Sequence, residues 1–235
     1  MQDHELQDNK TQELLSGLKS FALPGGEEAG RRVLRVRLTE QGEMRSAPGA
    51  RWIPFTAEEV IDVRRSGFVW EARLRAAKFV PMLVTDAYEN GHGRLVVKVA
   101  GALPLVNAHG PEFDRGELQR YLSGVIWCPP ILVGHPTLEW QAVGAQTLRV
   151  RDTEDPAGAT VDIDLGDGGC PLGCRADRPR MVGKRTIQTP WTGRAMDFRE
   201  IDGLRVPKHI EAAWLLTEGE FIYFRADVTA IKAEC

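Results

Sequence analysis

The sequence lacks the features that would place it in a membrane or mark it for export. No stretch approaches the roughly 20 apolar residues that a transmembrane helix requires. The first ten residues, MQDHELQDNK, contain neither the basic region nor the apolar run of a signal peptide. On these grounds we expect no transmembrane segment, and the sequence predicts a soluble protein in the cytoplasm.

Cysteine and excess positive charge are also scarce. Four cysteines in 235 residues are too few and too unevenly spread for a disulfide framework, which fits a reducing compartment. A formal net charge of -3 and a pI near 6.0 provide no basic field for a phosphate backbone, so nucleic acid is not expected as a partner. The nucleophile elbow, the P-loop and the dinucleotide-binding glycine motif are absent as well.

What is present is an ordinary globular composition. Hydrophobic residues make up 43% of the chain and charged residues 27%, which permits a sizeable core. Leu14, Leu15 and Leu18 stand at helical spacing before the breaker Pro24-Gly25-Gly26. We therefore expect residues 1–30 to form a short N-terminal helical segment and a loop, and residues 31–235 to form a single β domain.

Most of that domain alternates apolar and polar residues with a period of two, which is typical of half-buried strands. The alternation occurs in residues 34–39, 68–74, 94–99, 161–165, 210–216 and 222–228. Asn90-Gly91, Asp167-Gly168 and Asp202-Gly203 supply the positive backbone angles of tight hairpins. Successive strands should therefore pair antiparallel as a meander.

One segment, from about Asp114 to Cys128, changes to a period of three and four and is stopped by Pro129-Pro130. A single helix in the middle of the chain must bury its apolar stripe, and the inner face of a long sheet is the available surface. The predicted fold is mainly β (α+β): a long curved antiparallel sheet, or half-barrel, wrapped around one central helix, with a short N-terminal helix.

Two groups of residues could carry chemistry. Cys170 and Cys174 are separated by three residues, which fits neither a zinc knuckle nor a redox pair, so ordinary thiols are favoured and no metal or cofactor is expected. His109 precedes the helix with Glu117 and Arg120, and these three side chains could provide an acid, a base and a guanidinium. Glu117 and Arg120 could equally form a surface pair or anchor the helix to the sheet.

The order of several motifs resembles an uncharacterised bacterial family known only as a domain of unknown function. The matching motifs, over residues 30 to 232, are Arg51-Trp52-Ile53-Pro54-Phe55-Thr56-Ala57, Phe68-Val69-Trp70-Glu71-Ala72, Asp86-Ala87-Tyr88-Glu89-Asn90-Gly91-His92-Gly93, Gly116-Glu117-Leu118-Gln119-Arg120-Tyr121-Leu122, Trp127-Cys128-Pro129 and Pro190-Trp191-Thr192-Gly193. The resemblance implies the half-barrel fold of the lipoprotein-localisation-factor superfamily, with a hydrophobic interior, and it carries over no catalytic residue.

Two departures from this pattern stand out. Ser123-Gly124 follows the helix motif where the family usually has an acidic residue, which weakens any shared carboxylate mechanism. The segment from Cys170 to Arg180, with Pro171 and Pro179, is unlike the family's usual strand and puts the register of that strand in doubt.

The leading hypothesis, a ligand-binding protein, is based on the six tryptophans, many of which lie in or beside expected strands. A curved sheet lined by aromatic side chains can hold an apolar or amphipathic, lipid-like small molecule. The expected ligand-binding residues are the walls Trp70, Trp127 and Trp214 and the polar anchors Arg51, Tyr88, Glu117 and Arg120. The alternatives are an enzyme that uses Glu117, His109 and Arg120 and a non-catalytic interaction module. Catalysis is the less favoured of these hypotheses.

Overall fold

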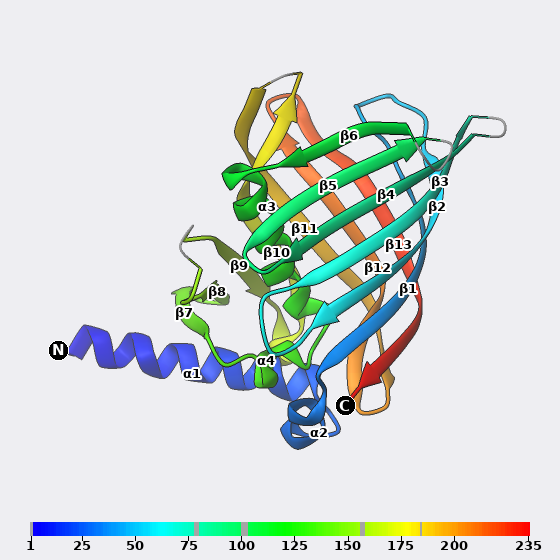
Figure 1. Cartoon of the computed structure of the whole chain (residues 1–235). Helices are drawn as coiled ribbons and strands as arrows, with labels where there is room; N and C mark the ends of the chain where they lie inside the picture. Colours follow the sequence, from blue (N-terminus) through cyan, green and yellow to red (C-terminus); the bar gives the residue numbers. More distant parts are fainter. Residues whose placement is uncertain (1, 78–79, 100–102, 156–157, 184) are drawn as a thin grey trace.

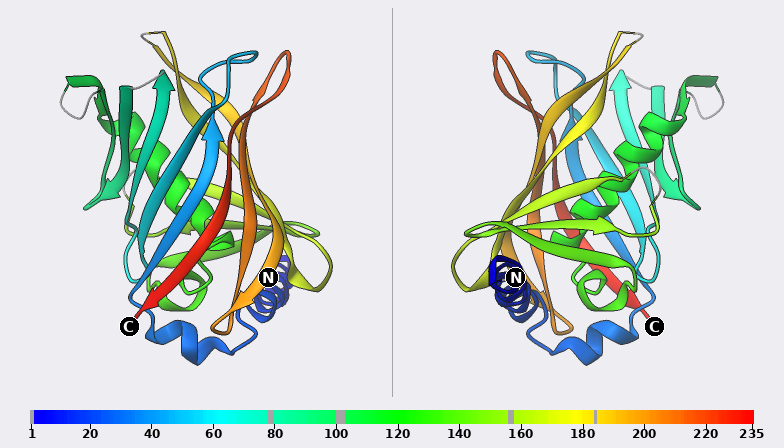
Figure 2. Two further views of the ribbon diagram at one scale, coloured as in Figure 1. Left: turned by 90° about the vertical axis from the view of Figure 1, so that its right-hand side faces the viewer. Right: turned by 90° about the vertical axis from the view of Figure 1, so that its left-hand side faces the viewer.

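One antiparallel sheet of thirteen strands dominates the described part of the chain (Figure 1). The structure is a computed structural model that describes residues 2–77, 80–99, 103–155, 158–183 and 185–235. The sheet is strongly curved, and its concave face surrounds a helix (Figures 1 and 2). The predicted curved sheet around a central helix is therefore confirmed.

The strands follow one another with few long connections. Their bounds are β1 (Arg35–Met44), β2 (Ile53–Asp62), β3 (Phe68–Ala77), β4 (Val80–Glu89), β5 (His92–Val99), β6 (Leu103–His109), β7 (Leu138–Gly144), β8 (Thr147–Asp152), β9 (Thr160–Leu165), β10 (Pro171–Val182), β11 (Arg185–Ile201), β12 (Leu204–Leu216) and β13 (Gly219–Glu234). Each of the six segments with a period of two contributes to a strand, and the antiparallel meander is confirmed.

Two of the expected hairpin turns show why the strands reverse where they do. Asn90 and Gly91 have φ values of 52° and 83°, and Asp202 and Gly203 have values of 51° and 77°. Two consecutive positive φ angles give a turn whose twist matches that of the flanking strands. The residues on either side pair directly, Glu89 with His92 in one hairpin and Ile201 with Leu204 in the other.

The sheet consists of two meanders that meet at its centre. Strands β1 to β6 form one meander and β7 to β13 the other, and β1 pairs with β13 between them. The two outer strands, β6 and β7, are connected by helix α3 (Pro111–Ser123), which crosses the concave face. The connection through α3 therefore places one helix between the two halves of the sheet.

Helix α3 ends earlier than the sequence predicts. The expected helix ran to Cys128, but the α-helix stops at Ser123 and continues as one 3-10 turn, η1 (Gly124–Ile126). Gly124 is a poor helix former, and Trp127 donates a backbone hydrogen bond to its carbonyl at 3.0 Å, the three-residue spacing of a 3-10 turn. A further short helix, α4 (Ile131–Gly134), follows the two prolines.

The N-terminal helix α1 (Gln2–Ala22) is much longer than expected and covers an edge of the sheet. Thr11 Oγ1 accepts the backbone N–H of Ala142 in β7 at 2.9 Å, and Gln7 donates to the carbonyl of the same residue. These two bonds satisfy backbone groups on an outer strand that would otherwise be open to pairing with another chain. A second helix, α2 (Glu27–Arg32), leads into β1. The division of the chain near residue 30 stays a prediction.

We expect Leu18→Ala to destabilise the protein by about 3 kcal/mol. Leu18 lies on α1 with its side chain fully buried, and truncation of that side chain leaves a cavity. Leu6→Ala in the same helix is the control, since 66% of Leu6 is exposed. Urea unfolding followed by circular dichroism measures both. If the free energy of unfolding falls by the same small amount in both variants, the burial of Leu18 does not hold α1 in place.

The segment from Cys170 to Arg180 forms a strand with an irregular start. Strand β10 pairs with β9, and the register shifts between Pro171 and Gly173, which bears out the doubt about its register. All four cysteines have free thiols, with Cys128 and Cys174 buried. Within the described ranges, no helix is both long and apolar enough to cross a membrane.

Candidate functional site

A cavity of about 280 Å³ lies between α3 and the concave face of the sheet. Its lining comes from strands of both meanders and from α3 itself: Trp70 and Asp86 from one half, Trp191 and Trp214 from the other, and Glu117 from the helix. This volume is at the lower end of the range for small-molecule sites. The path of α3 across the sheet therefore creates a space bounded by both halves.

Aromatic side chains form much of the wall. Trp191 donates its indole N–H to the hydroxyl of Tyr223 at 3.0 Å, and Trp214 stacks on Tyr223 with ring centroids 5.7 Å apart. Trp70 and Trp127 line the cavity from β3 and from the turn after α3. Among the described residues, the indole N–H of Trp127 is buried without a hydrogen-bond partner. The same indole nevertheless acts as a donor toward the Glu59 carboxyl group and lowers its pKa.

Arg120 connects α3 to two strands. Its guanidinium donates to Glu59 of β2 at 2.9 Å and to Asp86 of β4, and it lies 4.4 Å from the ring centroid of Phe68 and 5.4 Å from that of Trp70. Burial disfavours its charge, but the surrounding carboxylates outweigh this and raise its pKa. Of the two structural roles considered for Arg120, the structure shows the anchor between helix and sheet.

Two buried glutamates surround this guanidinium. Glu40 and Glu59 are each 3% exposed. Burial raises the pKa of Glu40, although Trp70 donates its indole N–H to the carboxylate at 2.8 Å. Burial likewise raises the pKa of Glu59 to about 8, with Arg120 opposing the effect and Glu40 adding to it. These carboxyl groups therefore bind protons much more readily than exposed ones.

Glu117 and Asp86 form the polar part of the cavity nearest to α3. Burial and the charge of Asp86 raise the pKa of Glu117 to about 8, while Arg178 and Arg120 oppose the shift. Glu117 lies 3.8 Å from Arg178, whose guanidinium donates to the carbonyl of Gly116 at 2.7 Å. When ionised, Oε2 of Glu117 and Oδ1 of Asp86 both lack a donor within the described ranges. A proton on Glu117 supplies one, because it can then donate to Asp86.

The structure brings most of the predicted ligand-binding residues to this cavity, and Arg51 and Tyr88 are the exceptions. The lining includes Trp70, Glu117, Arg120, Trp127 and Trp214. Arg51 is exposed just before β2, and Tyr88 is buried in β4 on the border of a smaller surface hollow near Ser66. Glu117 was expected at a rim but is only 8% exposed, because α3 turns it toward the sheet.

His109 does not join Glu117 and Arg120 in the cavity. It is exposed at the end of β6, where it pairs with Arg94 of β5. The structure therefore does not gather the three side chains of the suggested acid-base group at one place.

Sequence reasoning missed four charged residues of the site, namely Glu40, Glu59, Asp86 and Arg178. Each lies in phase with buried residues of its own strand: Glu40 follows Val36 and Leu38, and Asp86 stands between Val84 and Tyr88. Side chains two residues apart in a strand lie on the same face of the sheet. A charged residue two positions from buried apolar residues is therefore expected to point into the interior. This signal was available in the sequence.

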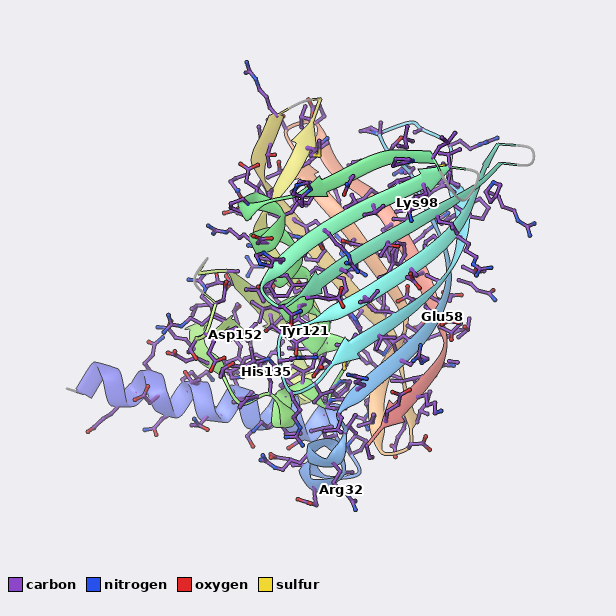
Figure 3. All side chains as sticks on the ribbon, viewed as in Figure 1. Arg32, Glu58, Lys98, Tyr121, His135 and Asp152 are labelled. Carbon is purple, nitrogen blue, oxygen red and sulfur yellow. The ribbon has the colours of Figure 1, made fainter. Side chains whose placement is uncertain are left out.

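A separate polar cluster lies beside the lower end of α3, where Tyr121, His135 and Asp152 are close together (Figure 3). His135 Nδ1 accepts the backbone N–H of Thr137 at 3.3 Å, so the ring proton is placed on Nε2, which faces Ser66 Oγ at 3.3 Å. Ser66 donates to Asp152 at 2.6 Å instead of to the histidine. The arrangement joins the turn between β2 and β3 to β7 and β8, and it does not activate the serine.

The comparison with protein families gives one match over most of the chain. The model of a family of unknown function (DUF6920) matches residues 20–232. The chain belongs to this family. None of the curated proteins compared with it matches. The resemblance to a family without an established function is confirmed.

Solved structures with a similar course of the chain have low sequence identity. A LolA superfamily protein from Nitrosomonas europaea is 12% identical with a TM-score of 0.49, covering 96% of this chain and 94% of that one. A putative outer membrane lipoprotein-sorting protein domain from Vibrio parahaemolyticus is 8% identical with a TM-score of 0.48, covering 92% and 93%. A DUF1329 family protein from Desulfovibrio piger is 8% identical with a TM-score of 0.47, covering 91% and 93%.

The predicted cytoplasmic location is corrected by these likenesses. The Vibrio parahaemolyticus structure is described as a putative outer membrane lipoprotein-sorting protein domain, and this description contradicts a cytoplasmic location. The prediction of a cytoplasmic location was wrong. It depended on the first residues of the sequence and on the low cysteine content. Neither observation determines the compartment in which a β domain works.

Proposed function

We propose that the protein binds an amphipathic, lipid-like small molecule in the cavity between α3 and the concave face of the sheet. One observation carries the proposal: aromatic and aliphatic walls and buried polar groups line the same cavity of about 280 Å³. A ligand with an apolar part and a polar end would match both kinds of lining. The TM-scores of the similar structures lie below 0.5, so the proposal rests on the cavity.

The walls provide the apolar contacts. Trp70, Trp191 and Trp214 line the cavity together with Ile210 and Phe224. Flat aromatic side chains offer a large contact area and lose little conformational freedom when a ligand binds. These side chains would therefore supply most of the affinity for the apolar part.

The polar end would meet groups that already face the cavity. The N–H of Trp127 and the carboxyl of Glu117 both line it, and each residue is 8% exposed. A buried polar atom without a partner is costly, and a ligand that supplies the partner recovers this free energy. The same groups would disfavour a purely apolar molecule.

Titration with the fluorescent probe N-phenyl-1-naphthylamine, which combines apolar rings with one N–H group, tests the proposal. We expect saturable binding, and we expect Ala212→Phe to weaken it by at least about tenfold because the added ring occupies the cavity. Ala212 lines the cavity from β12, whereas Ile187, 45% exposed on β11, does not line it, so Ile187→Phe is the matched control. Absence of probe binding, or equal weakening by both substitutions, would contradict the proposal. Native mass spectrometry of gently purified protein would identify any ligand retained from the cell.

A further inference from the structure

The charges that line the cavity are unbalanced, and this imbalance indicates which polar end the ligand has. In its buried part, four carboxyl groups face two guanidinium groups: Glu40, Glu59, Asp86 and Glu117 against Arg120 and Arg178. Nearer the opening, Glu112 and Glu211 accompany Arg180. The lining therefore contains six acidic side chains and three basic ones, an excess of three acids.

Arg120 neutralises only part of this excess. It donates to Glu59 and Asp86, while Arg178 lies 3.8 Å from Glu117. Two guanidinium groups cannot balance four ionised carboxylates in a space with little water, so protons must make up the difference. A cation brought by a ligand would do the same.

Glu117 is the group at which such a cation would bind. It lines the cavity and is 8% exposed. Its Oε2 accepts no hydrogen bond in the described part of the chain, because the Arg178 guanidinium at 3.8 Å is too distant to donate one. Oδ1 of Asp86, on the facing strand, is also buried without a donor there. Two acceptor oxygens that lack donors suit a group that carries several N–H bonds and a positive charge.

We propose that the polar end of the bound amphiphile is an ammonium group that replaces the proton held between Glu117 and Asp86. This inference rests on the proposed function and specifies its ligand. The proton passes to solvent as the ligand binds, so one positive charge is exchanged for another and the net charge of the site does not change. The tryptophan walls add to the preference, because aromatic faces attract cations.

An anionic polar end is the competing possibility, since the N–H of Trp127 and Nε of Arg178 are buried donors at the same cavity. A carboxylate ligand would satisfy these donors but would add a negative charge to a site in which four carboxyl groups already outnumber two guanidinium groups. A neutral oxygen of the ligand, such as a hydroxyl, satisfies the same donors without that cost. The charge count therefore favours the cation.

Isothermal titration calorimetry with three probes that share a decyl chain tests the inference. At pH 8.5 we expect decylammonium to bind roughly tenfold more tightly than decanol, and decanoate to bind most weakly. Between pH 6.5 and 8.5 the affinity for decylammonium should rise, because an alkylammonium stays charged below about pH 10 while Glu117 loses its proton. The affinity for decanol should change little over this interval.

Glu117→Gln provides the matched variant, since the amide keeps the shape of the side chain without its charge. It should lower the affinity for decylammonium to about that for decanol and remove the rise in affinity between pH 6.5 and 8.5. Glu58→Gln on the outer face of β2 is the control and should have no effect (Figure 3). If decanoate binds as tightly as decylammonium, the ammonium inference is overturned while the proposed function stands. If none of the three probes binds, the proposed function fails too.

Discussion

Arg120→Met is expected to lower the free energy of unfolding by about 4 kcal/mol at pH 8. The guanidinium is the partner of both Glu59 and Asp86, and Glu59 is only 3% exposed. Removing it leaves buried carboxylates without a counter-charge, which is among the most costly changes that a single substitution can make. Methionine keeps the unbranched aliphatic part of the side chain, so the loss reports mainly on the removal of the charge.

Urea unfolding followed by tryptophan fluorescence measures this loss. Arg151→Met is the control, because Arg151 pairs with Glu139 at 2.6 Å but both side chains are more than half exposed. An exposed pair contributes at most about 1 kcal/mol. The deficit of Arg120→Met should shrink at pH 5.5, where Glu59, whose pKa is about 8, binds a proton. A loss no larger than that of the control would refute the central role of Arg120.

Raising the pH from 7 to 9 is expected to lower the free energy of unfolding by about 2 to 3 kcal/mol. The folded protein holds the pKa of Glu59 and of Glu117 at about 8, above the ordinary value of 4.5. In this interval the unfolded chain has already lost both protons and the folded protein still binds them. Their stabilising contribution is complete below about pH 4.5 and is lost as the pH rises through 8.

The double variant Glu59→Gln with Glu117→Gln should lose most of this slope between pH 7 and 9. Only the smaller part due to Cys128 and Cys174, whose thiol pKa is raised by burial, should remain. The interval avoids His135, whose pKa is lowered by burial, so that its ring is neutral in both states. Glu58→Gln, with an exposed side chain, should keep the slope of the unmodified protein. A slope as steep in the double variant as in the unmodified protein would assign the pH dependence to other groups.

The elements of the fold were predictable because they depend on local patterns. A strand with one buried face shows its period in the sequence, and a hairpin such as Asn90-Gly91 is encoded by two residues. No local pattern predicts the pairing of β1 with β13, because it joins residues as far apart in the chain as Arg35 and Glu234. Thr11, whose hydroxyl accepts the N–H of Ala142, is equally distant in the chain from the strand it covers.

The site was predictable only where a residue type stands out by itself. Trp70, Trp127 and Trp214 were expected as walls because large aromatic residues are conspicuous. Glu40 and Glu59 were missed because a glutamate in a strand usually faces water, and only its phase relative to the buried residues indicates otherwise. Arg120, which donates to Glu59, lies on α3, and no sequence pattern predicts which strands a helix will contact.

The junction of β1 with β13 also determines the order in which the chain can complete its fold. Each meander can form from hairpins as soon as its own residues have left the ribosome, because neighbouring strands lie close in the chain. The first meander must then wait, with β1 as an open edge, until residues 219–234 have been synthesised. A half-finished sheet with an unpaired edge is prone to pair with other chains. The interval between the synthesis of β6 and of β13 is therefore when this protein is most exposed to aggregation.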